Sequence, residues 1–191
     1  NKNLNCILEI GCQGSLSNFI NRTLAPNQQI TSDMSLSRLS YNKSSSFKLA
    51  LSDEKLPFKS NSLSGIVSCL YIDNSSNSNN FFKQVFNILN ENGFFIISLF
   101  GSKTLSSFKE IFLKVEEKKF NGVSLRFHPL FDLQTVGNQI KQIGFKNVIV
   151  ETDTISIKYK TIFKLMDDLR GMGLTNSLKN RSKYFTPKSL F

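Results

Sequence analysis

Residues Leu8–Ser15 (LEIGCQGS) decide the fold of this chain. They continue a short apolar run that begins at Cys6, and Gly11 ends that run. Leu16–Leu24 then carries apolar residues at helical spacing and stops near Pro26. The stretch therefore predicts a buried strand, a glycine turn and a helix. A glycine at such a turn lets backbone N–H groups approach a ligand closely.

The alternation of strand and helix continues along the chain. After 6–10, short apolar runs predict strands over 28–31, 47–51, 63–70, 94–100 and 147–157. After 16–24, apolar residues at helical spacing predict helices over 34–41, 79–90, 104–119, 132–143 and 161–170. Strands joined by helical crossovers pair in parallel, and a ligand crevice opens at their carboxyl ends. We expect an α/β, Rossmann-like fold, a mostly parallel twisted sheet with helices on both faces.

Length and composition predict one domain. The chain has 191 residues, of which 40% are apolar and 18 are Phe, which is ample for a core. Residues 1–150 are expected to form the Rossmann-like core. Residues 151–191 are expected to add a strand extension and an amphipathic helical cap to the same domain. The polar stretch 73–80 (DNSSNSNN) is predicted to be a mobile loop, and Asn92-Gly93 a turn.

Composition also bounds the classes of function. No apolar stretch approaches the roughly 20 residues that span a bilayer, and no signal pattern opens the chain, so we expect a cytoplasmic protein without a membrane span. The three cysteines form no CxxC pair, which indicates reduced thiols and no metal site. The net charge of +10 is scattered among Asn and Ser, which indicates a solvated surface that could steer an acidic partner. Aromatic and basic residues do not interleave as nucleic-acid binding requires.

Asp33 is the first candidate for ligand binding. It follows the second predicted strand, about 20 residues after the glycine turn, where an acid can hydrogen-bond both ribose hydroxyls of a nucleotide-like cofactor. The alternative is that Asp33 caps the helix that follows it. The two roles are compatible, so both stay open.

Several motifs, taken in order, resemble those of the class I S-adenosylmethionine (SAM) methyltransferases. They are LEIGC at 8–12, DMS at 33–35, LPFKSNS at 56–62 and VFNILNENG at 85–93. Further segments resemble the BioC group, which includes malonyl-ACP O-methyltransferases and a mitochondrial complex I assembly factor. They are FGSKTL at 100–105, GF at 144–145, TDT at 152–154 and FKLMDDLRGMGLTN at 163–176. The DLRGMGLTN stretch looks closer to the assembly-factor branch.

The resemblance implies that SAM binds at the carboxyl ends of the strands. Its motifs assign cofactor binding to Glu9, Gly11, Gln13, Gly14, Asp33, Met34, Ser52, Asp53 and Leu70. No catalytic side chain is implied, because methyl transfer from SAM is an in-line displacement that needs proximity and orientation more than a protein nucleophile. The family pattern also has helices before the first strand and a strand after the 161–170 helix, which this chain is expected to lack.

The chain departs from the family pattern around the cofactor. The first motif of the family usually reads E/D-x-G-x-G-x-G, and Gln13 and Ser15 stand at two of the glycine positions. Ser52 stands where an acid tends to meet the adenine amino group, and Ser64 stands where the fourth strand usually has an acid. Asp73 and Asn74 stand where a histidine or tryptophan often follows that strand. These changes suggest weak or absent SAM binding. The alternative function is therefore a methyltransferase-like assembly or binding factor, or a protein-arginine hydroxylase.

The acceptor of an enzyme of this group is expected to be a small carboxylate, a carrier-bound acyl group or a protein. A guanidinium holds a carboxylate through two parallel hydrogen bonds, which makes Arg126 and Arg170 candidates. Arg170 could instead be a charge that favours the end of its helix. The only histidine, His128, is a further substrate candidate, with a structural role as its alternative.

Overall fold

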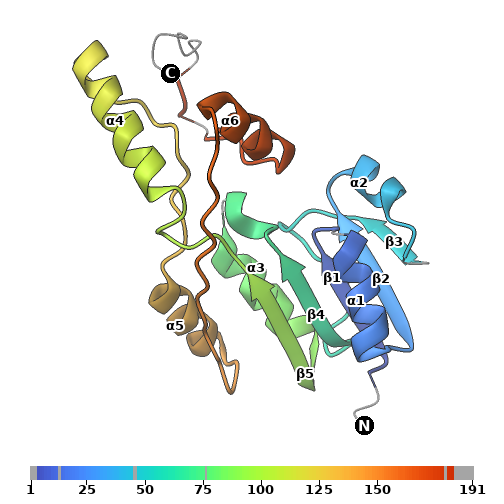
Figure 1. Cartoon of the computed structure of the whole chain (residues 1–191). Coiled ribbons are helices and arrows are strands. Elements are labelled where there is room, and N and C mark those ends of the chain that lie inside the picture. Colours follow the sequence, from blue (N-terminus) through green and yellow to red (C-terminus); the bar gives the residue numbers. More distant parts are fainter. Residues whose placement is uncertain (1–3, 13, 45–46, 76, 179, 183–191) are drawn as a thin grey trace. The chain divides into compact units, whose positions relative to one another are not determined.

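The computed structural model describes residues 4–12, 14–44, 47–75, 77–178 and 180–182 (Figure 1). The chain divides into two compact units. The sheet unit comprises Asn1–Phe100 and Gln134–Ile149, and the helical unit comprises Gly101–Leu133 and Val150–Phe191. The assignment of residues 151–191 to an extension of one domain stays a prediction.

The sheet unit contains five parallel strands in the order β3-β2-β1-β4-β5 (Figure 1). They are β1 (Cys6–Ile10), β2 (Gln28–Asp33), β3 (Phe47–Ala50), β4 (Leu63–Cys69) and β5 (Leu89–Ser98). From β1 the chain adds β2 and β3 on one side and then returns to place β4 on the other. The strand order therefore switches direction between β1 and β4, where α/β sheets bind ligands. The predicted α/β fold with a parallel sheet is confirmed.

Helices cover both faces of this sheet. The helical elements of the sheet unit are α1 (Gly14–Leu24), α2 (Leu36–Tyr41), the 3₁₀ turn η1 (Ile72–Asn74), α3 (Ser78–Ile88) and α5 (Leu133–Ile143). Side chains of neighbouring strand residues point to opposite faces, which Phe94 and Phe95 of β5 illustrate. Phe94 packs on the cluster that contains Ile20 of α1. Phe95 lies against Phe82 of α3, with ring centroids 6.2 Å apart, and against Phe145, which follows α5, at 5.8 Å.

The helical unit contains α4 (Ser106–Phe120) and α6 (Ile162–Gly171). Phe108 and Phe112 of α4 form an aromatic cluster with Phe127, with centroids between 5.6 and 5.8 Å apart. After α6, the side-chain amide of Asn176 donates to the carbonyl of Leu125 at 2.9 Å. Among the residues described, no helix is long and apolar enough to cross a membrane.

The predicted sixth strand does not form. No described segment pairs with residues 147–157, and Ile149, Ile155 and Ile157 are exposed there. Their apolar pattern is that of a strand, but a strand also needs a neighbour for its backbone groups. The sheet therefore has five strands, and the predicted strand extension is wrong for the described residues.

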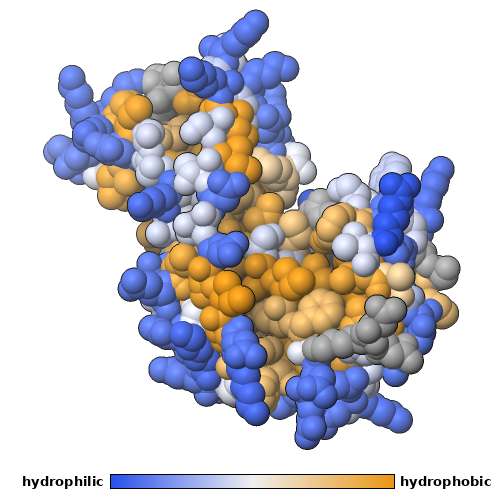
Figure 2. All heavy atoms as spheres, turned by 60° about the horizontal axis from the view of Figure 1, so that its bottom comes forward, coloured by the Kyte–Doolittle hydropathy of each residue, from blue (hydrophilic) through white to orange (hydrophobic). Residues whose placement is uncertain are grey.

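Figure 2 shows that apolar side chains cover much of the visible surface, and Ile96 of β5 is also exposed.

Two predicted loops are partly ordered. Asn92-Gly93 lies inside β5, where the pairing shifts from Leu63–Leu89 to Gly65–Phe94, as in a β-bulge. In the polar stretch 73–80, Asp73 is buried within η1 and its Oδ1 accepts the N–H of Phe100 at 2.7 Å. Within this stretch η1 ends at Asn74 and α3 begins at Ser78, while residue 76 lies outside the described residues; that the stretch is mobile stays a prediction.

Candidate functional site at the carboxyl edge of the sheet

The carboxyl ends of four adjacent strands bring the predicted cofactor residues to one edge. Ile10 of β1 pairs with Ser32 of β2 and Ser68 of β4, so these three strands end level with one another. The predicted residues follow in Gly11, Met34, Ser52, Asp53 and Leu70, while Asp33 ends β2 and Gly14 begins α1. Gln13 lies outside the described residues. The edge next to the β1/β4 switch is therefore the candidate site.

Gly11 makes the turn that leaves β1. Its φ is +84°, a conformation that side-chain-bearing residues rarely adopt, and its N–H donates to the carbonyl of Ser32 at 2.9 Å. A Cβ at Gly11 would lie 2.8 Å from Cβ of Tyr71. Gly14 is different, because no atom lies within 4 Å of where its Cβ would be. The turn therefore requires glycine at Gly11 and leaves open space at Gly14.

Asp33 ties the end of β2 to this turn. Its carboxylate is 4% exposed: Oδ2 accepts the N–H of Cys12 at 3.0 Å, and Oδ1 accepts the N–H of Ser35 at 2.7 Å. The guanidinium of Arg38 lies 3.9 Å from Oδ2. Ser35, and not Asp33, is the N-cap of α2. Each carboxylate oxygen can accept a second hydrogen bond, so ribose contact remains chemically open.

Glu9 lies beneath the turn and is fully buried. Its Oε2 accepts hydrogen bonds from side chains of α1 and β2: Ser17, Gln29 at 3.1 Å and Thr31 at 3.1 Å. Asn42 continues the network, because its amide donates to Ser17 Oγ at 2.7 Å and to Cys12 Sγ at 3.2 Å. Burial raises the pKa of the Cys12 thiol. Glu9 therefore supports the turn from inside the sheet unit.

The segment after β3 is held by Gln84 of α3. The side-chain oxygen of Gln84 accepts the N–H of Leu56 at 2.8 Å, and its amide donates to the carbonyl of Asp53 at 3.2 Å. The hydroxyl of Ser52 lies 3.5 Å from Asp53 Oδ1. An acid is thus present next to Ser52, one residue after the position where the family resemblance expects it.

Met34 and Leu70 lie at the surface of the same edge. Met34 follows β2 and is 63% exposed. Leu70 follows β4, has a φ of +48° and donates its N–H to the carbonyl of Ser98 at 3.0 Å. Leu70 is 39% exposed, so an apolar side chain is available to a ligand on either side of the turn.

Tyr71 was not predicted from the sequence as a site residue, and Asp73 was predicted only as a departure from the family pattern. The hydroxyl of Tyr71 donates to the carbonyl of Leu51 at 3.3 Å, and burial, with Asp53 and then Asp33 adding to it, raises the pKa of the phenol. Burial also raises the pKa of Asp73, whose Oδ2 has no hydrogen-bond partner among the described residues. Their position after an apolar strand is the only sequence signal that could have marked Tyr71 and Asp73 as residues of the candidate site.

In the helical unit, Arg126 is engaged by an internal acid. Its Nε and Nη2 donate to Oε1 of Glu116 at 2.8 and 2.7 Å, and Glu116 Oε2 accepts the N–H of Ser124 at 3.1 Å. Glu116 is 1% exposed. The carboxylate that meets the Arg126 fork is thus part of the protein, which favours a structural role for Arg126.

The other predicted substrate residues also have partners within the helical unit. His128 Nε2 lies 2.8 Å from the hydroxyl of Ser177 and accepts the N–H of Ser177 at 3.3 Å, and burial lowers the pKa of the imidazole. Arg170 pairs with Asp167 at 2.7 Å on the exposed side of α6. These contacts favour the structural alternatives, and a substrate role for either residue stays a prediction.

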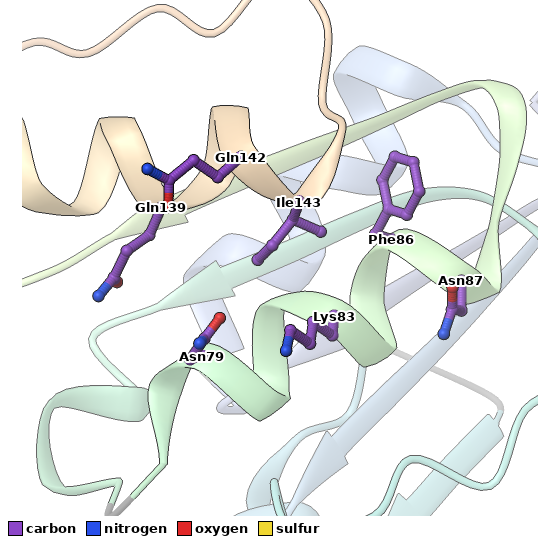
Figure 3. A pocket seen from close by; sticks show the side chains of 7 residues that line it. All are labelled: Asn79, Lys83, Phe86, Asn87, Gln139, Gln142 and Ile143. Carbon is purple, nitrogen blue, oxygen red and sulfur yellow. The ribbon is translucent and has the colours of Figure 1, made fainter.

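A separate groove of about 490 Å³ lies between α3 and α5 (Figure 3). Amide side chains dominate its lining, which consists of Asn79, Lys83, Phe86, Asn87, Gln139, Gln142 and Ile143. None of the predicted cofactor or substrate residues lines it.

Comparisons with known proteins agree with the observed fold. The chain is 28% identical to the human mitochondrial arginine-hydroxylase NDUFAF5 over 94% of its own length and 53% of the human protein. It is 26% identical to a malonyl-[acyl-carrier protein] O-methyltransferase of Coxiella burnetii, over 67% of this chain and 43% of that protein. A SAM-dependent methyltransferase structure from Mesorhizobium loti superposes with a TM-score of 0.53, at 12% identity, over 75% of this chain and 76% of that one.

The chain has the class I SAM methyltransferase fold. It is a homologue of the NDUFAF5 arginine hydroxylases and of the BioC-type malonyl-ACP O-methyltransferases. No protein-family model matches it. The chain spans about half the length of the human relative, so the activity of that whole protein is not carried over to it.

Proposed function

We propose that the sheet unit binds SAM at its carboxyl edge and that the protein is a SAM-dependent enzyme of the BioC-like group. The observation that carries the proposal is the junction of Gly11, Cys12 and Asp33 beside the β1/β4 switch. There Gly11 has a left-handed backbone conformation, and the carboxylate of Asp33 accepts the N–H of Cys12, with 3.0 Å between Cys12 N and Asp33 Oδ2. The fold family places its cofactor at such an edge, and the comparisons support this assignment.

The residues present are compatible with the cofactor. Open space at Gly14 lets the backbone at the start of α1 approach a ligand. Asp33 retains acceptor capacity for ribose hydroxyls, and Ser52 with Asp53 would meet the adenine amino group. When bound, SAM supplies an electrophilic methyl group on a sulfonium. The chain's own part is to orient the two reactants and to exclude water.

Methyl transfer to a small carboxylate, a carrier-bound acyl group or a protein is the first reaction proposed. The match to the malonyl-ACP O-methyltransferase supports an acidic acceptor. A net charge of +10 would speed encounter with an acidic carrier protein, more through steering than through added affinity.

Hydroxylation of a protein arginine is the second candidate. It is favoured by the extent of the match to the human arginine hydroxylase, which covers 94% of this chain against 67% for the malonyl-ACP methyltransferase. Arg126 already meets the buried carboxylate of Glu116, which argues against its use as a carboxylate fork, whereas the exposed pair of Arg170 with Asp167 leaves a substrate role for Arg170 as a prediction.

Cofactor binding is tested by isothermal titration of the protein with SAM and with its demethylated product. Asp33→Asn keeps the shape of the side chain but replaces one acceptor oxygen by an N–H₂ group, so we expect affinity to fall at least tenfold. Asp167→Asn makes the same charge change on the exposed side of α6 and should leave affinity unaltered. The proposal fails if the wild-type protein binds neither compound.

The reaction is tested by mass spectrometry of the acceptor. A malonyl-loaded carrier protein and arginine-containing candidate partners are incubated with the protein and SAM, and in parallel with dioxygen and an electron donor added, because insertion of one oxygen atom into a C–H bond needs an oxidant and two electrons that the chain does not supply. Replacement of a hydrogen by a methyl group identifies a methyltransferase, whereas the gain of one oxygen identifies a hydroxylase. An unmodified acceptor, in a sample where calorimetry shows tight SAM binding, would favour the assembly or binding role instead.

A further inference from the structure

Tyr71 covers the glycine turn at the point where the strand order switches. It follows β4, and its Cβ, Cδ2 and Cγ lie 2.8, 3.1 and 3.2 Å from the position that a Cβ on Gly11 would occupy. The base of the side chain therefore rests directly on the backbone of the turn. None of the cofactor motifs described above includes Tyr71 or requires an aromatic residue at this position.

The phenol end of the same side chain reaches the far side of the candidate site. Its hydroxyl donates to the carbonyl of Leu51, which follows β3, at 3.3 Å. Leu51 in turn donates its N–H to the carbonyl of Asp33 at 3.3 Å. Asp53 follows Leu51 by two residues in the chain, so the phenol oxygen lies beside the backbone that carries the two acids proposed for the ribose and adenine ends of SAM.

One ring thus connects the turn after β1 with the segment after β3. The strand order is β3-β2-β1-β4, so a side chain that starts after β4 and bonds Leu51 runs along the carboxyl edge, above the ends of the intervening strands. The side chain of Tyr71 thus lies along the edge at which the proposed function places SAM.

We propose that Tyr71 determines the affinity of this site, because its side chain, held by the hydrogen bond to Leu51, must leave the edge before SAM can bind. This inference rests on the proposed function. An apparent dissociation constant rises in inverse proportion to the fraction of molecules in the binding-competent state. Removing the hydroxyl raises that fraction, and removing the ring abolishes the competition.

The first test is calorimetric titration of SAM into the wild type, Tyr71→Phe and Tyr71→Ala. We expect Tyr71→Phe to bind about fivefold more tightly, the change that corresponds to one net hydrogen bond. Tyr71→Ala should bind more tightly still. Tyr41→Phe is the matched control, since it removes a hydroxyl from a residue that is 84% exposed, and its affinity should equal that of the wild type.

The second test follows the ring itself by fluorine NMR of protein labelled with 3-fluorotyrosine. The chain has 4 tyrosines, and loss of one signal in Tyr71→Phe assigns the Tyr71 resonance. Saturating SAM should shift this resonance strongly and leave that of Tyr41 in place. If Tyr71→Ala has a folding defect, the wild-type resonance and the calorimetric affinity of Tyr71→Phe, which retains the ring, still test the inference.

The outcomes separate the two proposals. If the wild type binds SAM, both Tyr71 variants bind no more tightly, and the Tyr71 resonance does not move, Tyr71 is only a wall of the site and the inference is wrong while the proposed function stands. If only Tyr71→Ala binds SAM, the ring closes the site in the wild type: the inference about Tyr71 is supported, whereas the proposal that the wild-type chain is a SAM-dependent enzyme fails. If no protein binds SAM, the proposed function fails, and the inference fails with it.

Discussion

Gly65 shows how one methyl group decides packing inside the sheet. It pairs with Phe94 across β4 and β5, and a Cβ at Gly65 would lie 2.4 Å from Cζ of the Phe94 ring. Gly65→Ala should lower the free energy of unfolding by about 1–3 kcal/mol, the usual cost of overpacking a core. Urea denaturation followed by circular dichroism measures it.

The control for this substitution is Gly122→Ala, because no atom lies within 4 Å of the new Cβ. Its effect should stay within about 0.5 kcal/mol. Gly65→Ala should also cost less in a Phe94→Leu background, where the ring that meets the new methyl group is gone. Equal costs in both backgrounds would contradict the assigned contact.

Glu116 makes stability depend on pH. Burial pushes the pKa of its carboxyl up, but the hydrogen bonds from Arg126 and Ser124 outweigh burial and the net pKa lies below the ordinary value of 4.5. A carboxyl whose pKa is lowered by folding adds stability above its unfolded pKa, and this stability is lost as pH falls through the folded pKa.

We therefore expect the helical unit to lose stability as the pH drops below about 4.5. The measurement is urea unfolding over a pH series for the wild type and for Glu116→Gln. Glu116→Gln should be less stable at neutral pH, because Arg126 loses its buried partner, and should show a flatter dependence on pH. The same slope in both proteins would exclude Glu116 as the titrating group.

At the level of elements, the strands differ in how fully their backbone groups are paired. β1 lies between β2 and β4, and β4 lies between β1 and β5, so both have hydrogen-bonded neighbours on two sides. Residues 150–158 have no regular secondary structure, and Ile155 and Ile157 are exposed. Local opening is easiest where few contacts hold the backbone.

Hydrogen exchange measured by mass spectrometry should therefore rank the two regions. Peptides from β1 and β4 should exchange most slowly, and peptides from 150–158 should exchange at rates close to those of an unfolded peptide. Peptides from α1, which packs on one face of the sheet, provide an intermediate reference. Strong protection of 150–158 would mean that this segment has a hydrogen-bonding partner in solution.

For the whole molecule, the net charge of +10 opposes folding through self-repulsion. Salt screens this repulsion, with a Debye length of about 10 Å at 0.1 M. We expect the urea midpoint to rise when sodium chloride is increased from low to physiological concentration. A midpoint that falls with salt would mean that surface ion pairs such as Lys114–Glu110 outweigh the general repulsion.

Local patterns were enough to predict most of the fold. Apolar periodicity and glycine turns indicated the five strands of the sheet and the major helices within a few residues, because both signals arise between neighbours in the chain. The alternation of strand and helix then required parallel pairing. The same reasoning placed Gly11 and Asp33 at one edge, since the carboxyl ends of parallel strands meet there, and the family resemblance added Ser52.

The sequence by itself thus determined the α/β sheet and the location of the candidate site, whereas only the tertiary structure decided which groups meet. An apolar pattern at 147–157 could not reveal that no strand among the described residues pairs with it. Arg126 was a candidate for a substrate carboxylate, and packing places it against Glu116. Tyr71 acquired its place over Gly11 from a contact across β1 and β4. These features depend on partners far apart in the chain, and residue spacing along a single segment does not encode them.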